Sequence, residues 1–228
     1  TVLLILAHPD DPEFFCGATL ARWARDGKAI TYVLATCGDK GSDDPTISPE
    51  VLCANRRAEQ LAAAEVIGAR QVNFLTYRDG ELVNSPELRR DLVRHLRRYR
   101  PDIVVTCDPT TFFRQDAYIN HPDHRAIGAA ALEAIFPAAG NWLYFPELRT
   151  EGLEPHTPRE VWLSLTNEPN TWVDVSETVE VKLAALREHK SQIKDYAALE
   201  QRVRQRLRRV EKDGREWYAE AFRVIRLA

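Results

Sequence analysis

The stretch that decides the fold is Val2-Leu3-Leu4-Ile5-Leu6, followed at once by Ala7-His8-Pro9-Asp10-Asp11-Pro12-Glu13. The five apolar residues predict a buried parallel strand. Open α/β sheets bind their ligands at the carboxyl ends of the strands. A histidine and two aspartates directly after this strand therefore indicate a candidate site.

Strand-like and helix-like segments alternate over the first two thirds of the chain. Apolar and β-branched runs predict strands at residues 2–6, 29–36, 71–75 and 102–107. Helices are expected between and after them, at residues 14–25, 49–67, 86–99 and 121–136. This alternation predicts an α/β fold, with a mostly parallel sheet between two layers of helices.

The last third of the chain follows a different pattern. Further strands are expected at residues 142–145, 161–165 and 171–175, joined by proline-rich turns. Ser176 is expected to cap a mostly helical tail over residues 177–210. Since neither a linker nor an internal repeat is visible, we predict one domain over residues 1–228, with a core at 1–140 and a C-terminal part at 141–228.

Composition bounds the possible partners. The chain has 228 residues, of which 44% are hydrophobic, and a formal net charge of −3. This charge gives no argument for nucleic acid, and the arginine-rich stretch near residues 202–209 is interspersed with acids, as on a solvated face. No apolar run approaches the ~20 residues of a membrane span. Without a visible targeting segment, the expected location is cytoplasmic; the tail offers a surface for a homo-oligomer.

The four cysteines are widely spaced and form no Cys-x-x-Cys pair. In a chain of this length such spacing favours reduced, buried positions over a disulfide framework. The four residues are Cys16, Cys37, Cys53 and Cys107.

A second motif, His121-Pro122-Asp123-His124, follows the fourth predicted strand. A catalytic zinc ion takes three protein ligands, usually histidine or carboxylate, and keeps a position for water. His8, Asp11 and His124 can supply this set, since neighbouring parallel strands end at the same edge of a sheet. The sequence therefore predicts a Zn²⁺ site.

The remaining polar residues of the two motifs fit the other roles in a hydrolytic reaction. Asp10 is adjacent to a predicted ligand and can accept a proton from water. His121, as an imidazolium, can donate to a developing oxyanion, and Asp123 can hold its tautomer and raise its pKa. Either motif alone is usually a capped turn; their joint occurrence favours a site.

These two motifs, together with Asn55-Arg56-Arg57-Ala58-Glu59, Tyr77-Arg78-Asp79-Gly80 and Tyr218-Ala219-Glu220-Ala221-Phe222, resemble those of the zinc-dependent N-acetylglucosaminyl deacetylases called LmbE-like or PIG-L-like. The resemblance spans nearly the whole chain. It implies a Rossmann-like sandwich and a zinc-bound water that attacks an acetamide.

Carried over residue by residue, the resemblance gives His8, Asp11 and His124 as metal ligands, Asp10 as general base, and His121 with Asp123 as oxyanion stabiliser and partner. It further implies that Arg56 contacts sugar hydroxyl groups. Two loops are expected to touch substrate through Asp39 and Asp108. Asp39 stands where many relatives have glutamate, and Asp108 opens a long aromatic loop with Phe112, Phe113 and Tyr118.

The leading hypothesis is therefore a zinc hydrolase that deacetylates an amino sugar or its conjugate. One alternative is an amidase that cleaves a larger amide of a thiol or sugar conjugate. A second is a non-catalytic module that binds a sugar or nucleotide; the intact metal set argues against it. A nucleic-acid partner for the arginine-rich tail is the weakest hypothesis.

Overall fold

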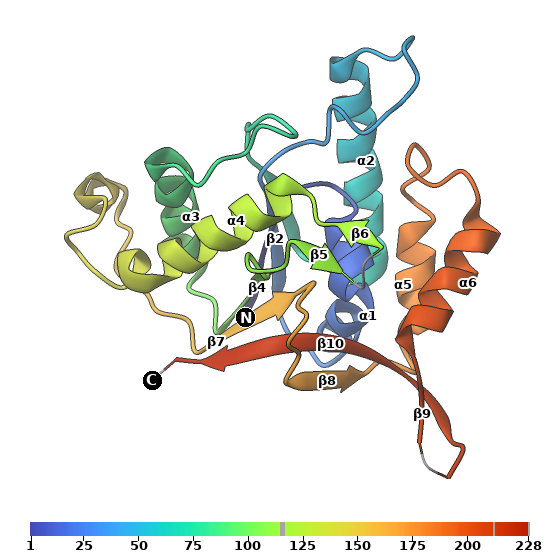
Figure 1. Ribbon diagram of the computed structural model, residues 1–228. Coiled ribbons are helices and arrows are strands. Elements are labelled where there is room, and N and C mark those ends of the chain that lie inside the picture. Colours follow the sequence, from blue (N-terminus) through green and yellow to red (C-terminus); the bar gives the residue numbers. More distant parts are fainter. Residues whose placement is uncertain (115–116, 212, 228) are drawn as a thin grey trace.

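A mixed β-sheet lies at the centre of the molecule (Figure 1). The structure is a computed structural model and describes residues 1–114, 117–211 and 213–227. The strand order is β3-β2-β1-β4-β7-β10-β8, with β9 paired to β10. The strands are β1 (Val2–Leu6), β2 (Ile30–Leu34), β3 (Gln71–Phe74), β4 (Ile103–Cys107), β7 (Glu160–Ser164), β8 (Thr171–Asp174), β9 (Arg208–Val210) and β10 (Glu216–Arg226).

Most of this sheet is parallel. The five strands from β3 to β7 run in the same direction, and β10 is antiparallel to β7, β8 and β9. Residues of β1 are almost completely buried on both faces, as a central parallel strand requires. The predicted α/β sandwich with a mostly parallel sheet is confirmed.

Helices cover both faces of the sheet (Figure 1). On one face α1 (Asp11–Arg25), α2 (Pro49–Ile67) and α5 (Val179–Leu186) pack together. On the other face lie α3 (Pro86–Tyr99) and α4 (Pro122–Glu133). The remaining elements are α6 (Tyr196–Leu207), the hairpin of β5 (Phe113–Arg114) and β6 (Tyr118–Ile119), a wide helical turn (Ala134–Ala139) and a 3₁₀ helix (Pro146–Glu151).

The helix boundaries follow from local chemistry. Ser48 and Ser85 cap α2 and α3, each accepting a hydrogen bond from a backbone amide of the first turn, and proline follows each cap. Gly68 ends α2 at φ 87°, a left-handed conformation that glycine adopts without steric cost. These boundaries agree with those predicted.

The chain reverses its direction of strand addition beside β1. From β1 it adds β2 and β3 on one side, and then returns to place β4 on the other side. Such a switch point opens a crevice at the carboxyl ends of the two central strands. Both sequence motifs begin near this crevice.

Three sequence predictions for the last third of the chain are wrong. Residues 142–145 form turns rather than a strand, with Leu143 85% exposed, and pair with no strand of the described chain. The helix after β8 begins beyond Thr178, because the Ser176 hydroxyl is bonded to Asp174 instead of capping it. The helical tail ends at Leu207, because the next three residues pair with the long strand β10 and form β9.

The cysteine prediction is half wrong. Cys37 and Cys53 form a disulfide with a Cα–Cα distance of 5.1 Å, whereas Cys16 and Cys107 are free and buried. The two bonded residues lie in the loop after β2 and in the first turns of α2, so the fold brings together positions 16 residues apart. Disulfides are typical of oxidising compartments, and the cytoplasmic location stays a prediction.

No helix in the described parts of the chain is both long enough and apolar enough to cross a bilayer.

Candidate metal centre and active site

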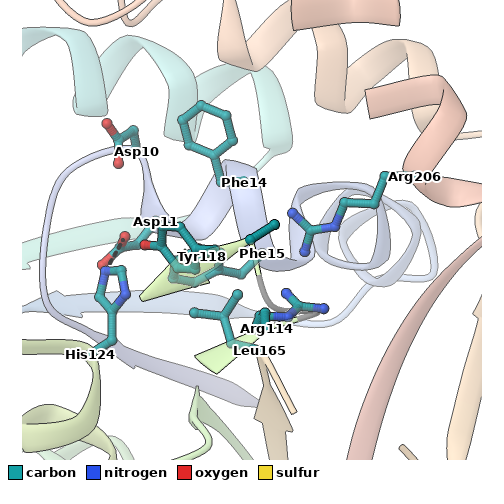
Figure 2. A pocket seen from close by; sticks show the side chains of 10 residues that line it. Asp10, Asp11, Phe14, Phe15, Arg114, Tyr118, His124, Leu165 and Arg206 are labelled. Atoms are coloured by element: carbon teal, nitrogen blue, oxygen red, sulfur yellow. Dashed lines mark hydrogen bonds and ion pairs between the residues drawn. The ribbon is translucent and has the colours of Figure 1, made fainter. Parts of the chain in front are cut away.

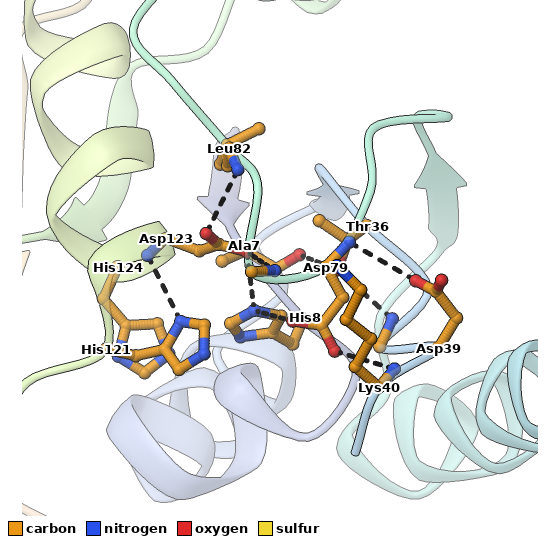
Figure 3. Close-up of polar contacts among 12 residues, drawn as sticks. Ala7, His8, Thr36, Asp39, Lys40, Asp79, Leu82, His121, Asp123 and His124 are labelled. Atoms are coloured by element: carbon orange, nitrogen blue, oxygen red, sulfur yellow. Dashed lines mark hydrogen bonds and ion pairs between the residues drawn. The ribbon is translucent and has the colours of Figure 1, made fainter. Parts of the chain in front are cut away.

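Both sequence motifs lie at the crevice between β1 and β4 (Figure 3). His8, Asp10 and Asp11 follow β1, whereas His121, Asp123 and His124 form the start of α4. The rings of His8 and His121 have centroids 4.7 Å apart. The fold therefore brings together six of the predicted site residues.

Asp11 connects the two predicted histidine ligands. Its Oδ1 lies 3.1 Å from His124 Nε2, and its Oδ2 lies 3.4 Å from His8 Nδ1. All three side chains are buried, with 3–7% of each residue exposed. Burial raises the pKa of Asp11, but the charges of His124 and His8 outweigh it and lower the pKa well below its usual range. The carboxylate is thus ionised and facing both rings.

The second nitrogen of each histidine ring has its own partner. His8 Nε2 lies 3.2 Å from Asp79 and 3.2 Å from Asp123, and His124 Nδ1 lies 3.0 Å from Asn120 Oδ1. Such partners fix the orientation and tautomer of a metal-binding histidine. They leave His8 Nδ1 and His124 Nε2 facing Asp11.

Sequence reasoning assigned no role to Asp79 or Asn120. Asp79 stood in the quoted loop after the third strand, and Asn120 directly precedes the second motif. Their positions beside the quoted motifs indicate that they lie near the site, but only the folded chain shows that they contact the histidines.

The cluster can hold a metal ion. Among the described residues, potential ligand atoms of His8, His121 and His124 all lie within 4.8 Å of one another, as do those of His8, Asp79 and Asp123. Nitrogen and carboxylate oxygen ligands are the donor types that zinc prefers. Several buried carboxylates gathered at one place also favour a cation electrostatically.

Asp123 has a different partner from the one predicted. Its buried carboxylate contacts His8 and accepts hydrogen bonds from the backbone amides of Gly80 and Leu82 (Figure 3). It does not hold the His121 ring, because the start of α4 turns the carboxylate toward His8; only its backbone amide donates to His121 Nδ1, at 3.2 Å.

The pKa of His121 also departs from the prediction. Burial, followed by the charge of His8, lowers the pKa, although the charge of Asp123 opposes this. The ring is therefore neutral near pH 7. Since Nδ1 accepts the amide hydrogen bond, the ring hydrogen is on Nε2.

Asp10 has an unusual backbone and a charged neighbour. It adopts φ 84°, a conformation rare for a residue with a side chain, and strain of this kind is concentrated at functional sites. Arg56 Nη2 donates to its carboxylate at 3.0 Å, and Gln60 accepts from its amide at 2.8 Å. Burial raises the pKa of Asp10 to about 6, while the charge of Arg56 opposes the shift.

Arg56 is buried beneath the site, with 5% exposure. Its guanidinium group donates to the carbonyls of Pro9 and Gly38 as well as to Asp10. The sequence prediction placed this side chain on sugar hydroxyl groups; the structure places it against Asp10 and the backbone. Gly38 and Gly41 leave the space that its guanidinium occupies.

The other two residues predicted to contact substrate, Asp39 and Asp108, accept hydrogen bonds from nearby loop residues. Asp39 accepts from the amide of Asp79 at 3.3 Å, and buried Asp108 accepts from the amide and hydroxyl of Thr110. Neither is among the described residues that line the cavity beside the metal cluster. Their predicted contact with substrate is untested.

A further buried network supports Asp10 from below. Glu13, which is completely buried, accepts from Gln60 Nε2 and lies 3.0 Å from His189 Nε2. Gln60 in turn binds the backbone of Asp10. The position of the strained turn therefore depends on α1, α2 and the segment after α5.

A cavity of about 540 Å³ opens beside this cluster (Figure 2). Volumes of about 300–1,000 Å³ are usual for small-molecule sites. Tyr118 lines the cavity, as predicted for the aromatic loop, whereas Phe112 and Phe113 are not part of its lining. Its described lining is Asp10, Asp11, Phe14, Phe15, Arg114, Ala117, Tyr118, His124, Leu165 and Arg206.

Residues 3–135 match the family described as PIG-L, GlcNAc-PI de-N-acetylase. The diacetylchitobiose deacetylase of Thermococcus kodakarensis is 36% identical over 191 residues, which cover 84% of this chain and 69% of that protein. A 1D-myo-inositol 2-acetamido-2-deoxy-alpha-D-glucopyranoside deacetylase of Saccharopolyspora erythraea is 31% identical over 84% of this chain and 83% of its own length.

A solved structure agrees with these sequence matches. The N,N'-diacetylchitobiose deacetylase of Pyrococcus horikoshii superposes with a TM-score of 0.87 at 33% identity, covering 99% of this chain and 83% of that one. The match extends beyond the family region to the C-terminal strands and helices.

Proposed function

Because the chain belongs to the GlcNAc-PI de-N-acetylase (PIG-L) family, we propose that it is a zinc-dependent hydrolase that removes the acetyl group from an N-acetylglucosamine-type sugar or sugar conjugate. Family membership confirms the resemblance and the N-deacetylase activity predicted from the sequence. The metal, the substrate and the residue roles are proposals. The observation that carries them is the placement of Asp10 beside the His8–Asp11–His124 cluster at the cavity.

The metal would be held by His8, Asp11 and His124. This set leaves Asp79, Asp123 and Asn120 to orient the two rings from behind. A bound zinc ion would supply Lewis-acid chemistry, lowering the pKa of water to about 7 and polarising a carbonyl group.

Asp10 acts as general base in this proposal. It accepts a proton from the attacking water and passes it to the nitrogen of the leaving amine. A raised pKa suits this task, since a base works best when its pKa lies near the working pH. Arg56 holds the carboxylate in position through its hydrogen bonds to Asp10 and to the carbonyl of Pro9.

His121 donates a hydrogen bond to the oxyanion that forms from the amide carbonyl. The neutral ring suffices, because its hydrogen is on Nε2 while Nδ1 accepts from the start of α4. This differs from the predicted imidazolium and needs no charged ring beside a cation. Preorganised donors of this kind contribute to catalysis because they need no reorientation during the reaction.

The test is acetate release from N,N'-diacetylchitobiose and a panel of N-acetylglucosamine conjugates, with zinc content measured in parallel. Asp10→Asn should lower kcat by roughly 10²–10⁴-fold and leave zinc content unchanged. Asp26→Asn, at the far end of α1, is the matched control. An Asp10→Asn variant with full turnover would contradict the proposed base.

The size of the cavity is also compatible with the alternative function, an amidase that cleaves an amide larger than an acetamide. A space of about 540 Å³ accommodates acyl groups longer than acetyl. A series of N-acyl glucosamines and sugar-free amides separates the two activities, since a true deacetylase loses rate as the acyl chain grows. Assembly into homo-oligomers stays a prediction from the sequence.

A further inference from the structure

The cavity beside the metal cluster has two chemically different ends (Figure 2). Asp10, Asp11 and His124 stand at one end, and the guanidinium groups of Arg114 and Arg206 stand at the other. Apolar side chains lie between the two ends, namely Phe15, Tyr118 and Leu165. Arg114 comes from the β5–β6 hairpin and Arg206 from α6.

These two arginines are unpaired within the described residues. Neither guanidinium group has a hydrogen bond or an ion pair there, whereas Arg204 and Arg208 on the same stretch pair with glutamates. Glu220, whose charge acts on Arg206, is hydrogen-bonded elsewhere: it accepts from Lys182 at 2.6 Å and from the amides of Ala18 and Thr19. Burial lowers the pKa of Arg206, and the charge of Glu220 opposes this shift without pairing directly with the guanidinium group.

The two like charges also affect one another. Burial, followed by the charge of Arg206, lowers the pKa of Arg114. Two guanidinium groups that face one cavity repel each other, and a bound anion relieves this repulsion. A smaller cavity of about 200 Å³ adjoins the same pair and shares Phe15 and Leu165 with the first, so the two arginines border both cavities.

We propose that the natural substrate carries an anionic group, a carboxylate or a phosphate, which Arg114 and Arg206 bind while the acetamido group lies at the metal cluster. Arginine binds both anions through paired hydrogen bonds. The apolar middle of the cavity fits the faces of a sugar ring or a short linker. This inference rests on the proposed deacetylase function and specifies its substrate class: an acidic conjugate of N-acetylglucosamine.

The experiment compares glycosides of N-acetylglucosamine that differ only at the end of the aglycone: a carboxylate, a phosphate monoester and a neutral carboxamide. In the zinc-loaded full chain, kcat/KM for an acidic glycoside should exceed that for the carboxamide by about 10- to 100-fold, the effect expected of hydrogen bonds to a charged group. The ratio of the two acidic glycosides shows which anion the site favours.

Two variants and a control locate the effect. Arg114→Gln and Arg206→Gln should each lower the acid-to-carboxamide ratio of kcat/KM about tenfold, and the double variant should bring it near one. Arg202→Gln changes an arginine of the same helix that is not part of the described lining of the cavity, and should keep the ratio of the unmodified protein. Equal rates on acid and carboxamide, or a preference that survives in the double variant, would overturn the proposal.

Calorimetric binding of the same glycosides separates this inference from the proposed function. If the acetamides are not cleaved but the acidic glycosides bind tenfold more tightly in an Arg206-dependent way, the anion site stands and the deacetylase proposal fails. If the carboxamide is cleaved and all three glycosides bind equally, the deacetylase proposal stands and the anion site fails.

Discussion

At the scale of single residues, the space that Gly38 leaves for Arg56 affects the pKa of Asp10. Gly38 has φ +68°, and a Cβ there would lie 2.1 Å from Arg56 Nη1. Gly38→Ala should therefore displace the guanidinium group and lower kcat/KM at least tenfold. The acid limb of the pH profile of kcat/KM should move to higher pH. The limb moves to higher pH because the displaced guanidinium group no longer lowers the pKa of Asp10, so this pKa rises.

Gly27→Ala is the control for this prediction. Gly27 has φ +84° and nothing within 4 Å of an added Cβ, so this variant carries the same backbone strain, about 1–2 kcal/mol, without touching Arg56. Equal pH profiles for the two variants would show that Arg56 does not act on Asp10.

At the scale of elements, the disulfide between Cys37 and Cys53 ties the loop after β2 to α2. Closing a loop of about 15 residues restricts the unfolded chain and contributes about 3 kcal/mol. Reduction, or the double change to serine, should lower the free energy of unfolding by about this amount. The turn that holds Gly38 should also loosen, so activity should fall before global unfolding.

Denaturant unfolding of the oxidised and reduced protein, with acetate release at each denaturant concentration, measures both effects. The two buried thiols, Cys16 and Cys107, are present in both samples and serve as the internal control. Identical unfolding midpoints would contradict a stabilising role.

At the scale of the whole molecule, the segment after α5 joins the N-terminal layers through His189 and Glu13. Burial lowers the pKa of His189, but its hydrogen bond and charge interaction with Glu13 prevail, so the pKa is raised. The stabilising effect is fully present below the usual histidine pKa, about 6.5, and is lost as pH rises through the raised value. Glu13→Gln should therefore destabilise the fold more at pH 6 than at pH 9.

The unfolding free energy of both proteins, measured with a chelator so that metal release does not contribute, checks this prediction. Breaking a buried pair costs about 3–5 kcal/mol, and this loss should shrink at the higher pH. Glu81→Gln, which removes an exposed ion pair with Lys40, should leave the pH dependence between these values unchanged. A loss independent of pH would mean that His189 does not titrate between pH 6 and pH 9.

Local sequence patterns determined most of the elements and the composition of the site. The apolar run Val2–Leu6, the serine caps and Gly68 act within one or two turns of chain, so the central strands and α2 and α3 were predicted to within two residues. The two histidine motifs were predicted to meet because parallel strands end at one edge. Residues 142–145 were mistaken for a strand because an apolar run alone cannot show whether a partner strand exists.

Tertiary structure alone decided which atoms meet. It turned Asp123 from His121 to His8, brought Asp79 and Asn120 to the histidines, buried Arg56 against Asp10 and joined Cys37 to Cys53. These contacts link segments that are distant in sequence, or depend on the direction in which one helix turn points a carboxylate. Hydrogen bonds and disulfides need approach within a few ångströms, and no sequence pattern specifies distances of that kind.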